Sequence, residues 1–208
     1  MKDFNKLSVA FYWHMHQPVY QLEETFLMPY VRLHAVKDYL DMVLVLEKYP
    51  KLKLNFNVVP SLVDSVLSYT DGELTDVHQD LTISNVEELS DEEKSFILNN
   101  FFSAKYETMI LKSERYVSLY KKRFKSQDLP IEEFSNQDYS DLMALFNLVW
   151  IDPVHRTRYP EFEYLFDKNE GFTQEDRENI IRLHLMIMRE IVPTYKEYLR
   201  QGRIEITT

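Results

Sequence analysis

An apolar run near the start of the chain ends abruptly in polar residues. Residues 7–13 read Leu-Ser-Val-Ala-Phe-Tyr-Trp, and His14, Met15, His16, Gln17 and Pro18 follow. So continuous an apolar run predicts a parallel strand over 7–13 that is covered on both faces. Because side chains alternate along a strand, His14 and His16 are expected on one side of it. Pro18 cannot continue a central ladder, so the strand must end before this residue.

The two histidines and the amide predict a binding or catalytic site. Sheets and barrels of the α/β class collect their active-site residues at the carboxyl ends of strands, where His14, His16 and Gln17 would lie. A turn whose carbonyls hydrogen-bond the ring would account for a single histidine in such a place. Two imidazoles on one face, followed by an amide, favour a site instead.

The next residues predict a unit of strand, helix, strand and helix. An amphipathic helix is expected over 35–49, because apolar residues recur there at helical spacing. A second strand is expected over 52–59, with Leu54 and Phe56 on one parity and Asn55 and Asn57 on the other. Pro60 would open a helix over 62–69. Such a βαβ arrangement makes the two strands parallel.

Turn residues and helical periodicity dominate from about 70 to 200, which predicts a large helical insertion. Ser90-Asp91-Glu92-Glu93 is typical of a capping box, for a helix that runs through Phe101 and on toward Lys125. A second helix is expected from about Ser135 to Phe146. The only extended piece expected in this region is a short one at 148–151.

The last part of the chain predicts a long helix and then a strand. The helix would begin at Thr173 and end at Gly202 in the left-handed conformation, with a kink or a break at Pro193. Residues 203–208 alternate as a strand does, with Ile204 and Ile206 on one face and the polar Glu205 on the other. A helix would normally follow to cover such a strand. We therefore expect residues 1–208 to be a truncated part of a longer domain.

The composition restricts the class of protein and of partner. The 208 residues are 45% hydrophobic, enough for a sizeable core, and 34 acidic against 24 basic residues make nucleic acid a poor partner. The chain has no cysteine, which removes disulfides, thiolate metal sites and a cysteine nucleophile. No stretch approaches membrane-spanning length, so we expect a cytoplasmic protein without a membrane partner. Its 14 tyrosines and 13 phenylalanines suit sugar stacking, although most should be core residues.

Taken in order, several segments resemble the N-terminal part of glycoside hydrolase family 57, whose members act on α-glucans as amylases, 4-α-glucanotransferases, branching enzymes and amylopullulanases. The matching segments span nearly the whole chain: Trp13-His14-Met15-His16-Gln17-Pro18, Arg32-Leu33-His34-Ala35-Val36-Lys37-Asp38-Tyr39, Asn57-Val58-Val59-Pro60-Ser61-Leu62, Trp150-Ile151-Asp152-Pro153, Phe172-Thr173-Gln174-Glu175-Asp176 and Gly202-Arg203-Ile204-Glu205.

The resemblance implies the first part of a distorted, incomplete TIM-like (β/α)7 barrel with a helical insertion, in a retaining enzyme that needs no cofactor and no metal. It places His16, Gln17 and Pro18 in the family's first motif, and Gly202 and Glu205 in its second. The family's nucleophilic glutamate and acid/base aspartate belong to later motifs, which would lie beyond Thr208. This chain would then supply part of the substrate pocket and would be inactive alone.

Each candidate residue has an expected role. His14 and His16 could donate hydrogen bonds to sugar hydroxyls and to developing charge, and Gln17 could donate and accept at once. Glu205 is expected to bind substrate or to support the site rather than to act as the nucleophile. The simpler interpretation is an ordinary strand glutamate that pairs with Arg203 or with another exposed residue.

Four further candidates, which we name the outer candidates, are expected to pack around the site or support it and not to bind substrate directly. They are Trp13, Trp150, Arg32 and His34. Packing is favoured over sugar stacking for Trp13, whose parity is opposite to that of the histidines, and also for Trp150. Arg32 and His34 would either cap the following helix or support the site from behind. No role is assigned to the remaining histidines, His78, His155 and His184.

Two other functions remain open. A His-x-His at a strand end can hold zinc, so a metal-dependent deacetylase or mannosidase-like hydrolase is one alternative, with Glu205 or Asp152 as the carboxylate ligand. A noncatalytic sugar-binding subunit is the other.

An unfinished barrel would also expose sheet edges that invite self-association. In every case the carboxyl ends of the three strands should share one rim, with His14, His16 and Glu205 in one cleft and residues 70–200 outside the sheet.

Overall fold

The computed structural model describes residues 7, 9–125, 127–128 and 130–208. Its main sheet has three parallel strands, β1 (Tyr12–Met15), β4 (Leu54–Val58) and β6 (Ile204–Thr207), in the order β1-β4-β6. The sequence predicted three neighbouring parallel strands, and the structure confirms their parallel pairing and the places of the second and third. Within the described part of the chain, β1 and β6 each pair with β4 only, so both keep one free edge.

The two faces of this sheet have opposite character. Leu54, Phe56 and Ile204 are buried on one face, where the Phe56 ring meets Tyr195 edge-on at 5.2 Å between ring centres. The other face carries the exposed side chains of Tyr12, His14, Glu205 and Thr207. The parities predicted for the second and third strands are therefore confirmed.

The prediction of a first strand over 7–13 covered on both faces was wrong. The strand begins at Tyr12 and includes His14 and Met15, whereas Ser8 lies outside the described residues. Phe11, Tyr12 and Trp13 are 50%, 60% and 47% exposed. A short apolar run does not reveal whether its strand is central or at an edge, and here helices cover only one face.

The segment between β1 and β4 contains two short strands and a helical run. β2 (Gln21–Leu22) and β3 (Thr25–Phe26) form a hairpin, and the helical run then changes pitch along its length. Its parts are α1 (Tyr30–His34), the π-helical η1 (Ala35–Tyr39), α2 (Asp41–Leu44) and the 3-10 helix η2 (Val45–Lys48). The helix predicted over 35–49 thus begins earlier and is not uniform. Within η1 the Val36 carbonyl accepts a bond from the Asp152 amide at 3.0 Å.

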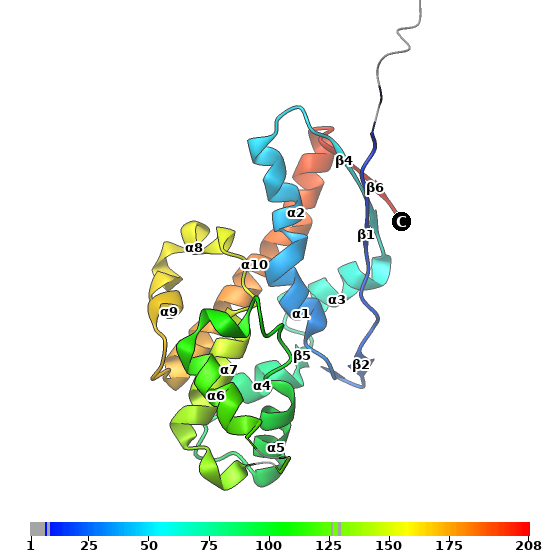
Figure 1. Cartoon of the computed structure of the whole chain (residues 1–208). Coiled ribbons are helices and arrows are strands. Elements are labelled where there is room, and N and C mark those ends of the chain that lie inside the picture. Colours follow the sequence, from blue (N-terminus) through cyan, green and yellow to red (C-terminus); the bar gives the residue numbers. More distant parts are fainter. Residues whose placement is uncertain (1–6, 8, 126, 129) are drawn as a thin grey trace, which may run out of the picture.

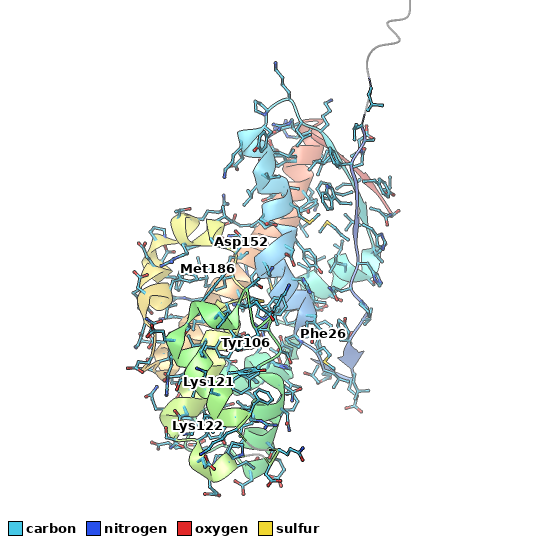
Figure 2. All side chains as sticks on the ribbon, viewed as in Figure 1. Phe26, Tyr106, Lys121, Lys122, Asp152 and Met186 are labelled. Atoms are coloured by element: carbon cyan, nitrogen blue, oxygen red, sulfur yellow. The ribbon has the colours of Figure 1, made fainter. Side chains whose placement is uncertain are left out.

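A second small sheet has the order β2-β3-β5, in which β5 (Thr75–Asp76) runs parallel to β3. The sequence predicted no strand at this position, because a two-residue strand is too short to show alternation. The Phe26 side chain, labelled in Figure 2, is 1% exposed and stacks on Tyr69 at 4.8 Å. This sheet therefore joins the segment after β1 to the start of the insertion.

Helices make up most of the chain between β4 and β6, as predicted. They are α3 (Pro60–Thr70), α4 (Val77–Ile83), α5 (Asp91–Asn100), η3 (Ile110–Lys112), α6 (Glu114–Arg123), η4 (Ile131–Glu133), α7 (Asn136–Leu148), α8 (Val154–Arg158), η5 (Pro160–Phe162), α9 (Glu163–Asp167) and α10 (Gln174–Arg200). Figure 1 shows the main sheet at one end of an elongated molecule, α4 to α7 toward the other, and α10 extending from the helices back to the sheet.

The predicted starts of three helices are confirmed, whereas some predicted helix ends are wrong. Ser90, Ser135 and Thr173 each cap a helix in a reciprocal capping box. The first of these helices stops at Asn100 and does not reach Lys125. The extended piece expected at 148–151 is the end of α7 and a turn.

The long helix α10 continues through Pro193 without the predicted break. Ile191 and Tyr195 on either side are 6% exposed, and their packing offsets the hydrogen bond that proline removes. Gly202 has φ +65°, which confirms its left-handed position. In the part of the chain that the structure describes, no helix has the length and apolar character needed to cross a membrane.

Candidate functional site

A row of polar side chains crosses all three strands of the main sheet on its open face. His14 lies beside Asn57, and Asn57 lies beside Thr207. The His14 Nδ1 atom is 2.6 Å from Asn57 Oδ1, and Asn57 Nδ2 donates to Thr207 Oγ1 at 3.3 Å. Because the Asn57 oxygen can only accept, His14 Nδ1 carries the proton. In the neutral ring Nε2 is then free to accept a hydrogen bond.

A second row lies two residues nearer the amino ends of the strands, on the same face. It contains Tyr12, Asn55 and Glu205. The Tyr12 hydroxyl is 2.6 Å from Thr207 Oγ1, which links this row to the first. The Glu205 side chain is exposed. Both rows belong to one continuous polar surface.

The simpler interpretation of Glu205 included an ion pair with Arg203, and this pair does not form between the two residues. The Arg203 guanidinium donates instead to the carbonyls of Leu46, Tyr49 and Leu52, and so closes the loop before β4. Within the described residues the Glu205 carboxylate makes no ion pair. It is therefore available to a ligand.

The first motif lies at the carboxyl rim of this sheet. Met15 is buried at the end of β1, and His16 follows it as an exposed residue. The His16 ring stacks on His14 with 5.9 Å between centres and 21° between planes. Gln17 is half-buried, and its Oε1 atom accepts a hydrogen bond from the Tyr20 hydroxyl at 3.1 Å. The two imidazoles and the amide thus lie together, with His14 inside the strand rather than after it.

The outer candidates lie in different places. Trp13 projects from the face opposite His14 and is 47% exposed. Trp150 is only 8% exposed and meets His34 edge-on at 5.5 Å. His34 Nδ1 is 2.5 Å from Asp38 Oδ2, one helical turn on. Among the described residues no side chain caps α1 or the η1 helix that follows Arg32 and His34, so of their two predicted roles the capping role is not found.

Arg32 is fully buried and is the centre of a polar network. Its Nε and Nη2 atoms donate to the two oxygens of Asp76 at 2.7 and 3.1 Å. Its Nη1 atom donates to Asn147 Oδ1 at 2.7 Å and to His184 Nδ1 at 2.9 Å. Because guanidinium only donates, His184 Nδ1 must accept, and its Nε2 donates to the Asn147 carbonyl at 3.2 Å.

This network joins α1 to β5, α7 and α10, far from the open sheet face. Burial opposes ionisation of Asp76, but the adjacent Arg32 guanidinium outweighs it and holds the pKa of the Asp76 carboxyl below its ordinary value. The sequence assigned no role to His184, and helical periodicity alone could not have identified its partner.

Metal binding has little geometric support on the described residues. They contain no group of three or more histidine, aspartate and glutamate side chains arranged to hold a metal ion. The residues that sequence reasoning missed at the site are Tyr12, Asn57 and Thr207. The signal for Tyr12 and Thr207 was present in the sequence, since each is a polar residue on the parity of His14 or Glu205 in its own strand, whereas the place of Asn57 beside them depends on the register between strands.

Residues 10–208, nearly the whole chain, match the family model described as glycosyl hydrolase family 57. Neither a curated protein nor a solved structure matches the chain.

Proposed function

The chain belongs to glycosyl hydrolase family 57, and from this premise we propose that its open sheet face binds α-glucan in a retaining hydrolase or 4-α-glucanotransferase. Family membership implies a glycoside hydrolase or a transferase that acts on α-glucans. The open face would line the interior of a TIM-like barrel, whose substrate sites lie at the carboxyl ends of its strands.

One observation carries this proposal. Polar side chains from three separate strands share the open face. The row of His14, Asn57 and Thr207 lies next to the rim that carries His16 and Gln17, and Glu205 lies one row farther back. The helices pack against the opposite face, where Phe56 contacts Tyr195. Adjacent strands lie about 4.8 Å apart, so side chains of neighbouring strands can contact one sugar ring together.

The proposed contacts follow from hydrogen-bonding capacity. Sugar hydroxyls both donate and accept, and this face offers both functions. His14 Nε2 can accept, because Nδ1 is bound to Asn57. The exposed Glu205 carboxylate can accept two hydrogen bonds from neighbouring hydroxyls. His16 and the Gln17 amide would contact the same sugar at the rim.

The chemical step needs two carboxyl groups. Retaining enzymes place a nucleophile and an acid/base about 5–5.5 Å apart. On the open face of β1, β4 and β6 the only carboxylate is Glu205. We therefore propose that these strands bind the substrate and that the family's glutamate and aspartate are not among their residues.

Titration of the 208-residue chain with maltotriose, followed by NMR, tests the proposal. We expect His16→Ala and Glu205→Gln each to weaken binding by about tenfold, because a lost hydrogen bond to a polar ligand costs about 1–1.5 kcal/mol. Glu161→Gln is the matched control, since Glu161 is exposed in η5, away from the sheet. Equal affinity in all variants, or no binding by the wild-type chain, would refute the proposed site.

A further inference from the structure

A surface groove of about 590 Å³ lies between the start of the helical run after β3 and the loop that follows α5. Tyr30, His34 and Lys37 line one side, and Ser103, Lys105 and Thr108 line the other. Trp150 and Phe102, which are 8% and 7% exposed, lie at its base. None of these residues belongs to the main sheet.

A series of aromatic contacts leads from Gln17 of the sheet site to this groove. The Tyr20 hydroxyl donates to Gln17, and the Tyr20 ring meets Tyr30 edge-on at 6.0 Å. The ring centres of Tyr30 and His34 are 6.4 Å apart, and those of His34 and Trp150 are 5.5 Å apart. Tyr20, Tyr30 and His34 are all partly exposed. A band of rings, which we name the ring band (Tyr20, Tyr30, His34 and Trp150), therefore leads from the first motif into the groove.

The groove has the chemistry of a site for a neutral polyhydroxylated ligand. Its base is aromatic, and flat apolar rings suit the C–H face of a pyranose. Its sides offer the hydroxyls of Ser103 and Thr108, the ammonium groups of Lys37 and Lys105, and the His34 imidazole. Both donors and acceptors are thus present around an apolar base, as in most sites for small ligands.

The positive charge that Lys37 and Lys105 bring to the groove is offset next to Lys37. The Asp38 carboxylate lies 2.5 Å from His34 Nδ1 and 3.8 Å from Lys37 Nζ. This carboxylate offsets the lysine charge on its side of the groove.

We propose that the ring band and the groove bind the distal glucosyl units of a long α-glucan, whose reacting end lies at the open sheet face. This inference rests on the proposed function of that face. The helical insertion then selects long chains over short ones, because a maltotriose at the sheet would not extend into the groove.

Isothermal titration of the 208-residue chain with maltotriose and with maltoheptaose tests this inference. We expect maltoheptaose to bind about tenfold more tightly than maltotriose, which corresponds to about 1.4 kcal/mol. Tyr30→Ala should remove this preference and leave maltotriose affinity within about twofold, as a distal subsite requires. Thr108→Trp should do the same by filling the groove, and Thr108 is exposed, so this variant does not disturb the core.

Two controls separate the outcomes. Tyr164→Ala removes a tyrosine that is 46% exposed on α9, outside the groove, and should keep the preference. His16→Ala should weaken both ligands equally. Equal affinity of the wild-type chain for the two oligosaccharides, or a preference that survives Thr108→Trp, would overturn the distal subsite. If maltotriose does not bind but maltoheptaose binds in a manner that Thr108→Trp abolishes, the sheet site fails and the groove remains a glucan site.

Discussion

Several buried side chains of this protein have titration behaviour that follows from their surroundings. His78 is 3% exposed, and its ring lies among Phe96, Phe101 and Phe146 with centres 4.9 to 5.7 Å away. Its Nδ1 atom has no hydrogen-bond partner among the residues that the structure describes. Burial lowers the pKa of His78 to about 4, although the nearby Asp76 carboxylate opposes this shift.

We predict that His78→Phe reduces acid destabilisation. Because the pKa of His78 is lower in the folded state than in the unfolded one, its contribution is present above pH 6.5 and is lost as pH falls toward about 4. The full shift corresponds to a loss on the order of 3 kcal/mol. Phenylalanine keeps the ring contacts and cannot be protonated, so the free energy of unfolding should fall less between pH 6.5 and pH 4.5.

Urea unfolding at several pH values measures this difference. His16→Ala is the control, because it removes a histidine from an exposed position outside the Phe96, Phe101 and Phe146 cluster. An unchanged pH dependence in His78→Phe would show that the buried ring does not control acid unfolding.

Asp41 changes the free energy of unfolding with pH in the direction opposite to His78. The test must therefore compare the pH dependence of the variant with that of the wild type, and not the slope of one protein alone. Burial, followed by the neighbouring carboxylates Asp152 and Asp38, raises the pKa of Asp41 to about 7. Its Oδ1 atom is buried, and within the described part of the chain it has no hydrogen-bond partner. A carboxyl with a raised folded-state pKa loses its favourable contribution as pH rises from about 4 to about 7.

At the scale of elements, the Arg32 network connects parts of the chain that are distant in sequence. The Arg32–Asp76 ion pair is fully buried on both sides. The Tyr69 hydroxyl also donates to Asp76 Oδ2 at 3.0 Å, and the Gln79 backbone N–H donates to Asp76 Oδ1 at 2.8 Å. The carboxylate therefore has four donors, and the loss of the Arg32 cation leaves a buried charge.

We predict that Arg32→Met lowers the free energy of unfolding by about 3–5 kcal/mol, because Asp76 stays buried without its cation. Asp76→Asn should cost a similar amount for the converse reason. The double variant Arg32→Met/Asp76→Asn should lose clearly less than the two single losses together, as a double-mutant cycle of chemical unfolding would report.

The matched control is Arg200→Met. Arg200 pairs with Glu197 at the exposed end of α10, with 75% of its side chain accessible. Exposed pairs contribute little, so this variant should unfold as the wild type does. Additive losses at Arg32 and Asp76 would show that the two side chains are not coupled.

At the scale of the whole molecule, the open sheet face determines what the chain can do alone. This face of the three strands carries one carboxylate, Glu205. A retaining mechanism needs two. We therefore predict that the purified 208-residue chain releases no reducing sugar from maltoheptaose and transfers no glucosyl units, even where it binds the oligosaccharide.

Chromatographic analysis of maltoheptaose after long incubation measures this. Glu205→Gln serves as the comparison, because any trace of turnover by the chain itself should depend on that carboxylate. Turnover that Glu205→Gln abolishes would mean that Glu205 is a catalytic residue and not a binding residue.

The sequence by itself determined the features that depend on neighbours along the chain. Strand parity placed Glu205 on one face and the two isoleucines of β6 on the other. The capping boxes at Ser90, Ser135 and Thr173 join residues three apart. Short-range periodicity and capping are legible in sequence because each involves only a few consecutive residues.

Only the tertiary structure decided which faces are covered and which polar groups meet. The partners of Arg32 are 44, 115 and 152 residues away along the chain, and the row from His14 to Thr207 crosses three strands through Asn57. Helices bury one face of the main sheet and leave the apolar start of β1 half-exposed. Such contacts depend on how whole elements pack, and local propensity carries no information about which distant element will supply the partner.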